Sequence, residues 1–569
     1  MSPPAGGKSG LTKRQQAEKL RQALKLDYES QWKPHHRDIA DYIQPRRPRF
    51  LVSDYQNAGT PKNEKIINNV ATESSDTLRA GLVSGVVSAA RPWFRLTTQE
   101  PGLAEDGEVK AWLFEAEQRL YGIIGKSNFY LRIEELFGDL GDFGIGPFHI
   151  EPDIDGDEVI RCFVHPVGSY YVAQNARFEI DTVFRDVPLT VKQLVKKFTY
   201  EKCCLQVRIA WDNGDIYKVF PVVHYIQPNE EYVEGALGWK GKKFASCWYE
   251  EARTPEEGFL HEGGFGYFPT PTPRWKVTGN DAYGTSPGMV ALADVKGLQH
   301  LEEQKMGLVD KTVNPPMNVP HNLRGQQASL LPGAENPVGG TGGKLEPAVV
   351  IHPQAFQHIL ALIQEHEGRI RRSYHADLFR LLEAIDKGQM TAFEVRERIQ
   401  EKMQLIGPAY ERVEEELLDP AMDAIIHICL EAFMLPPVPE ALAGAELKIE
   451  YTSIVAQALK ASGIGAIREL LQMVGNLVAV DPDVLDNLDL DQIVRDYADK
   501  LGISPKLLRE PEVVKAIRDA KAKAAAQAKA QQQAAMMAQG AKTLSETDTE
   551  GTNALTDIIG ESGHGRLVG

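Results

Sequence analysis

Hydrophobic residues recur every three or four positions along most of this chain, which is the spacing of amphipathic helices. One such stretch runs from Leu11 to Ile43 and stops at Pro45, and a second runs from about Lys65 to Ala90. Between residues 146 and 269 the pattern changes to short alternating runs rich in Val, Ile, Phe and Tyr, which predict strands. The chain therefore begins with helices that lead into a β-rich segment.

Two local signals refine the β-rich segment. The run DIDGDE (153–158) resembles a calcium loop, but Gly156 stands fourth where such a loop needs glycine sixth, so we expect a hairpin turn. Thr190 and Gln193 have the spacing of a capping box, which predicts the start of a short helix.

Two long helices are predicted on either side of a stretch rich in glycine and proline. The first covers about 287–311 and the second begins at Pro353, with 312–352 between them. In the second helix the pairs Glu365–Arg369 and Glu367–Arg371 have the favourable i to i+4 order. At about 1.5 Å per residue each helix extends for roughly 30 to 40 Å, which is enough for a stalk.

A further helix is predicted over 391–435. Thr391 and Glu394 form a second capping box, and we expect a kink at Gly407 and Pro408. Short helices and turns follow to about residue 510. Residues 511–543 are rich in Ala, Gln and Lys, which favour a helix without a wide apolar face, and 544–569 are typical of a flexible tail.

Composition excludes several classes of protein. Of the 569 residues 43% are hydrophobic and 25% charged, as in folded soluble proteins, and no window approaches the ~20 apolar residues of a membrane span. The N-terminus lacks the plan of a secretory signal, so we expect assembly in a cytosol. The net charge of -16 opposes tight wrapping of a polyphosphate. Five cysteines without a CxxC pair indicate free thiols.

The chain offers little for catalysis. GGTGGK (339–344) is not a phosphate-binding loop, because Val338 stands where the first glycine is needed and Leu345 replaces the Ser or Thr that binds magnesium. There is no HExxH motif. We therefore expect that the chain is not an enzyme and that it has no metal site and no cofactor.

Several strings taken together are similar to a known family. They are WKPHHRDIADYIQPRR (32–47), GLVSGVVSAARPWFRL (81–96), HPVGSYYVAQNARFEIDTVFRDVPLTVKQL (165–194), PRWKVTGNDAYGTSPGMVALADVKGLQ (273–299), VNPPMNVP (313–320), MTAFEVRERIQEKMQLIGPAYERVEEELLDP (390–420), IEYTSIVAQA (449–458) and DLDQIVRDYADKLGISPKLLR (489–509). Because these strings follow one another in the family's order and together cover most of the chain, the chain resembles the head-to-tail connecting, or portal, proteins of short-tailed, podovirus-type bacteriophages. The segment after about residue 515 lies outside the resemblance and takes no role from it.

The resemblance implies an α+β, mainly α, portal fold assembled as a ring. Its parts would be a wing (1–284, with the β-rich segment 146–269), stem helix 1 (285–311), a clip (312–352), stem helix 2 (353–380), a tunnel loop (381–390), a long kinked wing helix (391–435) and a crown (436–510). The Ala/Gln/Lys-rich helix (511–543) and the tail (544–569) would follow.

The resemblance also implies a function and partners. Twelve copies would form a ring at one capsid vertex of the virion, assembled in the host cytoplasm, through which double-stranded DNA is packaged and ejected. The partners would be the packaging motor (terminase), tail or adaptor proteins, and the major capsid and scaffolding proteins, with no membrane span. The alternative is a DNA-binding regulatory or processing subunit of a nucleic-acid enzyme.

Candidate site residues follow from these parts. The tunnel loop would contain Glu383, Asp386, Lys387, Gly388, Gln389 and Met390. The clip would contact its partners through Asn314, Pro315, Pro316, Arg324 and Lys344. Because carboxylates repel phosphates and let a duplex slide, we expect the channel to be lined by Glu411, Glu414, Glu415 and Glu416.

Overall fold

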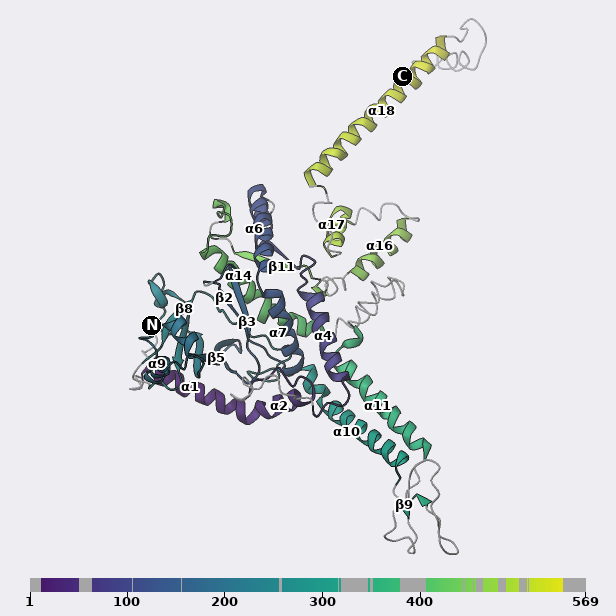
Figure 1. Cartoon of the computed structure of the whole chain (residues 1–569). Coiled ribbons are helices and arrows are strands. Elements are labelled where there is room, and N and C mark those ends of the chain that lie inside the picture. The colour runs from purple at the N-terminus through teal and green to yellow at the C-terminus, as the bar shows by residue number, and fades with distance from the viewer. Residues whose placement is uncertain are drawn as a thin grey trace. The chain divides into compact units, whose positions relative to one another are not determined.

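The computed structural model divides into two compact units, Met1–Ser462 (unit 1) and Gly463–Gly569 (unit 2). It describes residues 12–50, 64–104, 106–154, 156–254, 258–315, 317–318, 346–347, 352–378, 406–442, 444, 446–453, 455–456, 464–478, 488–500, 509 and 511–545. Helices predominate and the strands pair antiparallel, which confirms the expected α+β, mainly α, class (Figure 1).

The helices described in unit 1 are α1 (Lys13–Asp27), α2 (Lys33–Tyr42), α4 (Val70–Val86), α5 (Pro101–Ala104), α6 (Gly107–Lys126), α7 (Phe129–Phe143), α8 (Val191–Phe198), α9 (Leu205–Asp212), α10 (Pro287–Val313), α11 (Pro353–Ser373) and α14 (Asp419–Glu431). The strands are β1 (Phe94–Thr98), β2 (Phe148–Pro152), β3 (Ile160–Val164), β4 (Tyr170–Gln174), β5 (Ile180–Thr190), β6 (Val219–Pro228), β7 (Phe244–Glu250), β8 (His261–Phe265), β9 (Met317–Asn318), β10 (Glu346–Pro347) and β11 (Leu447–Tyr451).

Two π-helical turns interrupt long helices shortly before a proline. The first, Tyr28–Trp32, joins α1 to α2, so the predicted helix over 11–43 is confirmed with one irregular turn. The second, Glu414–Leu418, precedes α14. Proline has no N–H group to donate to the carbonyl four residues before it. In both turns the residue just before the proline donates its backbone N–H to the carbonyl five residues earlier, from Lys33 to Tyr28 and from Asp419 to Glu414. Gly407 lies within the helical residues 406–413, and the chain before 406 is outside the described residues, so the predicted kink stays a prediction.

The second predicted helix is shorter than expected, because α4 covers 70–86 rather than 65–90. The backbone N–H groups of Ile67 and Asn68 donate to the side chain of Gln299, at 2.7 and 2.9 Å, so these residues are held outside the helix. A contact more than 230 positions away in the chain therefore sets the start of α4.

The β-rich segment forms one hairpin and one five-stranded sheet. β2 and β3 pair antiparallel, which confirms the hairpin predicted around residues 153–158. The sheet has the order β4-β5-β6-β7-β8. α8 begins at the predicted capping box, with the Thr190 hydroxyl accepting from the Gln193 backbone N–H. α8 and α9 pack on the end of the sheet around a small separate core that includes Phe198, Phe220 and Trp248.

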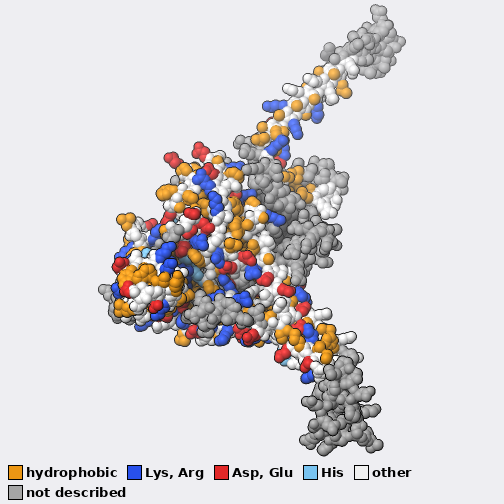
Figure 2. Space-filling view, in the orientation of Figure 1, with side chains coloured by type: hydrophobic (Ala, Val, Ile, Leu, Met, Phe, Trp, Pro, Cys, Tyr) orange, Lys and Arg blue, Asp and Glu red, His pale blue; other side chains and the backbone are white. Residues whose placement is uncertain are grey.

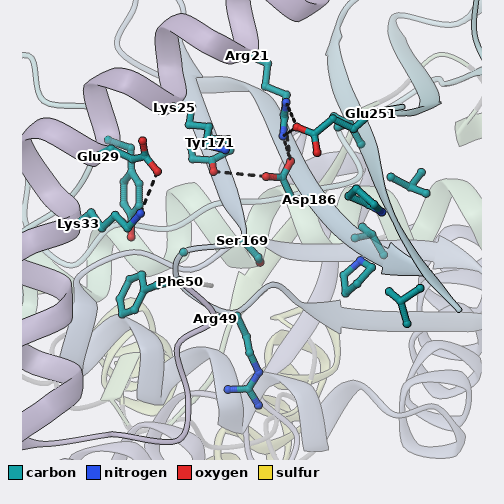
Figure 3. Close-up of a pocket in the computed structure, with 18 residues that line it drawn as sticks. Arg21, Lys25, Glu29, Lys33, Arg49, Phe50, Ser169, Tyr171, Asp186 and Glu251 are labelled. Atoms are coloured by element: carbon teal, nitrogen blue, oxygen red, sulfur yellow. Dashed lines mark hydrogen bonds and ion pairs between the residues drawn. The ribbon is translucent and has the colours of Figure 1, made fainter. Parts of the chain in front are cut away.

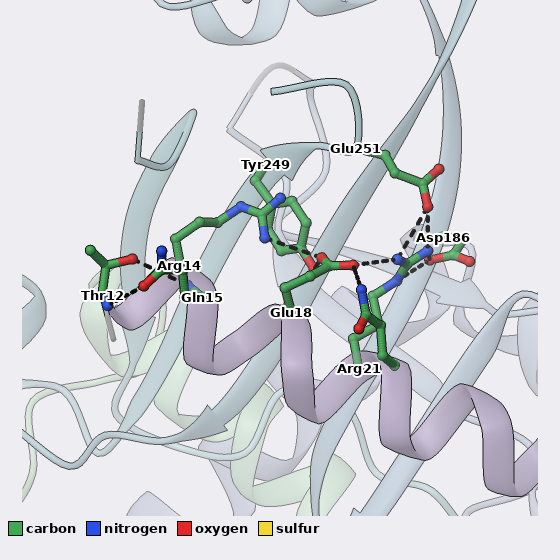
Figure 4. A network of polar contacts seen from close by, with 9 residues as sticks. Thr12, Arg14, Gln15, Glu18, Arg21, Asp186, Tyr249 and Glu251 are labelled. Atoms are coloured by element: carbon green, nitrogen blue, oxygen red, sulfur yellow. Dashed lines mark hydrogen bonds and ion pairs between the residues drawn. The ribbon is translucent and has the colours of Figure 1, made fainter. Parts of the chain in front are cut away.

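Five ionisable side chains fasten α1 to the five-stranded sheet (Figure 4). Arg21 donates to Asp186 at 2.9 Å and to Glu251 at 3.2 Å, and these carboxylates raise its pKa against the effect of burial. Glu18 lies between Arg21 and Tyr249, whose hydroxyl donates to it at 2.8 Å. The N-terminal helix α1 is thus part of the fold of unit 1.

The main core continues from the sheet into the helices. α4, α7 and α10 bury Leu78, Phe137 and Val295 in one continuous cluster. β1 pairs with β11, Phe94 opposite Tyr451, which brings residues 447–451 into unit 1. The boundary between the units, after residue 462, therefore differs from the predicted start of the crown at 436. The pairing of two strands more than 340 positions apart explains the difference.

Unit 2 is helical where it is described. It contains α16 (Ile464–Val478), α17 (Leu490–Lys500) and α18 (Pro511–Ser545). α18 confirms the helix predicted over 511–543. Across the described residues no helix is both long and apolar enough to cross a membrane.

Candidate stem and channel surfaces

The hairpin of α10 and α11 is the most extended element of unit 1 (Figure 1). The helices lie side by side where Gly297 faces His366, and a Cβ atom on Gly297 would lie 3.2 Å from that imidazole. His366 Nδ1 lies 2.9 Å from Asp294 Oδ1. Glycine on one helix and a polar pair beside it therefore set the distance between the two stem helices.

The sequence predicted both helices and their surface ion pairs. Ser286 caps α10, its hydroxyl accepting from the Met289 backbone N–H at 3.0 Å. The pairs Glu365–Arg369 and Glu367–Arg371 form at 2.5 and 3.2 Å. α11 ends at Ser373 rather than at the predicted 380, because His375 has a φ of 52°, which is incompatible with a continuing α-helix.

Asn68 joins the segment before α4 to both α10 and α11. Its amide donates to Glu302 of α10 at 3.0 Å and to Glu367 of α11 at 3.1 Å. Gln299 of α10 donates in turn to the Asn68 carbonyl at 2.9 Å. One residue in the approach to α4 therefore fixes both stem helices.

A second tie lies at Asp142, near the C-terminus of α7. Its carboxylate is buried and accepts from the hydroxyls of Ser75 at 2.8 Å and Tyr374 at 2.9 Å. Burial raises the pKa of Asp142 to about 7, although both hydrogen bonds favour the charged form. The Asp142 backbone carbonyl accepts from the Ser286 hydroxyl at 2.6 Å. The start of α10 and the end of α11 thus meet at this residue.

Gly288 allows that meeting. A Cβ atom on this residue would lie 2.7 Å from the Asp142 carbonyl oxygen and 2.9 Å from the Tyr374 hydroxyl. Only glycine leaves room for the backbone of α10 to approach α7 so closely.

Both stem helices also expose apolar side chains. Val290, Met306 and Val313 of α10 are 70%, 56% and 71% exposed. Phe356, Leu360 and Leu362 of α11 are exposed as well. A long, narrow hairpin that leaves such side chains in water is typical of an element that packs against another chain.

The predicted clip is described only at its ends. Asn314 and Pro315 follow the end of α10, and the Asn314 backbone N–H donates to Asp310 at 2.7 Å. β9 pairs antiparallel with β10, so the two ends of the segment 312–352 lie together. Pro316, Arg324 and Lys344 lie outside the described residues. So do the tunnel-loop candidates Glu383, Asp386, Lys387, Gly388, Gln389 and Met390.

The four predicted channel glutamates have different surroundings. Glu411 and Glu415 are exposed, and Glu414 is half-buried. Glu416 points into the subunit, where it accepts from the buried guanidinium of Arg274 at 2.7 Å and from the Arg274 backbone N–H at 2.8 Å. Glu416 is therefore engaged in holding the helix to the loop before α10.

Unit 1 contains a cavity of about 190 Å³ between α1, the segment at Phe50 and strands β5 and β6 (Figure 3). Every carboxylate that lines it already has a partner: Glu29 accepts from Lys33 at 2.9 Å, and Asp186 and Glu251 accept from Arg21. No group of three metal-ligating side chains occurs among the described residues. The carboxylates that line the cavity are therefore all engaged within the protein.

Comparison with known proteins defines the class of this chain. It belongs to the bacteriophage head-to-tail connecting protein family, whose model matches residues 14–508. The resemblance seen in the sequence is thereby confirmed.

Curated relatives narrow the class. The chain is 36% identical to the portal protein of Salmonella phage epsilon15 over 96% of its own length and 98% of that protein. It is 35% identical to the probable portal protein of Bordetella phage BPP-1, over 94% and 96%. A solved structure, the neck of an empty GTA particle, matches 70% of this chain and 86% of its own chain, at 13% identity and a TM-score of 0.32.

The chain is accordingly a portal, or head-to-tail connecting, protein of a phage, a structural component of the virion at the head–tail junction. Its relatives are structural proteins, which confirms the expectation that it is not an enzyme. The family implies partners in the capsid and the tail. The alternative of a nucleic-acid enzyme subunit finds no support among these relatives.

Sequence reasoning missed the residues that fix the stem. Asn68, Asp142 and Arg274 each act on partners more than 65 positions away. In the sequence, Gly288 is simply a glycine near the start of a predicted helix. No local pattern in the sequence marks any of them.

Proposed function

We propose that twelve copies of this chain form a ring at one capsid vertex, whose central channel carries double-stranded DNA during packaging and ejection. The exposed apolar side chains of α10 and α11 are the observation that carries the proposal. Packing the stem hairpins of neighbouring copies side by side would remove them from water, at about 25 cal/mol per Å² buried.

The dimensions of DNA support this arrangement. A B-form duplex is roughly 20 Å wide, so helices just outside it have axes on a circle of about 110 Å circumference. With interaxial distances of about 9 to 10 Å, about eleven or twelve helices close that circle. One stem helix from each copy is sufficient.

We assign the surfaces of the ring as follows. The clip (312–352) faces the packaging motor (terminase) and later the tail or adaptor proteins, with Asn314, Pro315, Pro316, Arg324 and Lys344 as candidate contacts. The wing (1–284) faces the major capsid and scaffolding proteins, and the crown lies inside the capsid. The partly described ladder of β9 and β10, which closes the base of the clip, supports its role as a separate tip.

Exposed carboxylates would line part of the channel. Glu411 and Glu415 are exposed, and with half-buried Glu414 they form one acidic group; Glu416 is set aside because Arg274 engages it. The tunnel loop (381–390), with Glu383, Asp386, Lys387, Gly388, Gln389 and Met390, would border the same channel. Carboxylates near a duplex repel its phosphates, so the DNA slides without adhering.

Electron microscopy and native mass of the purified chain test the ring. We expect rings of about twelve copies with a central hole. The variant V290K/M306K should remain folded and lose the rings, because two ammonium groups would have to be buried in each stem contact. L237K is the matched control, since Leu237 is 99% exposed in the loop between β6 and β7. Rings of V290K/M306K as abundant as those of L237K would refute the proposed interface.

A second experiment tests the channel. E411K/E415K should assemble normally and package DNA more slowly, because the lining would attract phosphates. Packaging at the rate of the parent chain would exclude these glutamates from the lining.

A further inference from the structure

α18 differs in chemistry from the rest of the chain. It contains 35 residues, about 50 Å of helix. Almost every side chain described in it is exposed, with Val514 and Ile517 half-buried near its start. Alanine, glutamine and lysine have high intrinsic helix propensity, which explains how this helix forms with so little packing.

Its first half is cationic in an acidic protein. From 515 to 529 it has five basic residues and one acidic residue, whereas the whole chain has a net charge of -16. Figure 2 shows Lys and Arg side chains along this part of the helix. Arg518 is used within unit 2, where it forms two hydrogen bonds to Asp491 at 2.5 and 2.7 Å.

Four lysines remain along the helix. Lys515, Lys521, Lys523 and Lys529 are exposed, and no acidic side chain among the described residues forms an ion pair with them. They extend over about 21 Å, and Lys515, Lys521 and Lys529 fall within about 120° around the axis. Duplex DNA carries one negative charge per ~1.7 Å of its axis, so phosphates are present along the whole length that the lysines span.

The same helix is poorly suited to a protein groove. From Arg518 to Ala535 it has no apolar side chain larger than alanine. A helix that docks on another protein presents large apolar residues at i, i+3, i+4 and i+7. Contact with a polyanion needs only the lysines, and the alanines let the helix approach closely.

We infer that α18 is a DNA-contacting helix, whose four exposed lysines bind the phosphates of duplex DNA without reading its sequence. This inference rests on the proposed function, in which the duplex passes through the assembled protein. It assigns to unit 2 an attraction for DNA, in contrast to the repulsion assigned to the channel glutamates.

Binding of the full-length protein to a 20-base-pair duplex, measured by fluorescence anisotropy between 50 and 200 mM NaCl, tests the inference. The test variant is K515Q/K521Q/K523Q/K529Q. The control K110Q/K192Q/K196Q/K202Q removes the same charge from exposed positions in unit 1. We expect the test variant to bind at least tenfold more weakly at 50 mM salt. Its slope of log K against log salt should fall by about two to four, at ~0.9 per lost phosphate contact, while the control stays within twofold of the parent chain.

Equal binding by the test variant and the control would overturn the inference. It would also be overturned if polyglutamate, at the same charge concentration, displaced the helix from DNA as well as a second duplex does, because the ligand would then be an acidic protein. Electron microscopy of the same samples keeps the proposals apart. Intact rings with unchanged DNA binding refute only the role of α18, whereas lysine-dependent binding without rings refutes only the ring.

Discussion

The pH dependence of the free energy of unfolding tests the buried carboxylate of Asp142, which accepts hydrogen bonds from Ser75 and Tyr374. In D142N the amide oxygen still accepts from the Tyr374 hydroxyl, and its NH2 group can donate to the Ser75 hydroxyl. The pKa of Asp142 rises from an ordinary 3.8 to about 7 in the folded chain. The folded state therefore binds a proton that the unfolded state releases between these values, so stability falls as pH rises through this window. The asparagine variant lacks this loss.

The magnitude follows from the shift. Three pKa units at about 1.4 kcal/mol each give a total loss of about 4 kcal/mol, of which about 2.5 kcal/mol falls between pH 5 and pH 8. Relative to the parent chain, D142N should thus gain about 2.5 kcal/mol over this range and then level off. The comparison removes the contributions of other titrating groups, which the two chains share.

Urea unfolding followed by the fluorescence of the seven tryptophans measures the difference at each pH. D310N, at an exposed position of α10, is the control and should track the parent chain throughout. A stability difference between D142N and the parent that stays flat from pH 5 to pH 8 would refute the reasoning, because the carboxylate would then be charged in the folded state at every pH.

Three further outcomes are expected. E416A should lower the free energy of unfolding by about 3 kcal/mol, because it leaves the buried Arg274 guanidinium without its carboxylate; a loss below 1 kcal/mol in urea unfolding would contradict this. G288A should lower the thermal midpoint, because overpacking costs about 1 to 3 kcal/mol of the free energy of unfolding. G307A should raise the midpoint, because a Cβ atom there would have no atom within 4 Å and alanine favours the helix; calorimetry of both variants measures the two shifts. F433G should stabilise unit 1 by about 0.5 to 1 kcal/mol, since the parent residue has a φ of 54° with its side chain 91% exposed; a lower midpoint in the same scan would refute this.

Local patterns predicted the elements with a sequence signal of their own. Thr190 and Gln193 mark the start of α8, and the spacing of Glu365 and Arg369 predicts an ion pair that forms. The strands of the sheet fall within the predicted segment 146–269. Each of these features depends on residues a few positions apart, so the sequence displays them directly.

The ends of elements and the surroundings of site residues were less predictable. α4 starts late because Gln299 holds Ile67 and Asn68, and α11 ends early at His375. Glu416 belongs to the same acidic run as Glu415, yet only Glu416 meets Arg274. Periodicity cannot separate two neighbouring glutamates whose difference lies in a loop 142 positions away.

The sequence alone determined the helical and β-rich segments, the two stem helices and the family, because periodicity, capping and ordered motifs are properties of the chain read in order. Only the tertiary structure decided how the stem is held: Asn68 reaches both stem helices, and Asp142 joins the start of one to the end of the other. The physical reason is that burial and hydrogen bonding depend on which distant segments meet. A carboxylate with no local signal acquires a raised pKa and a structural role only once the fold has enclosed it.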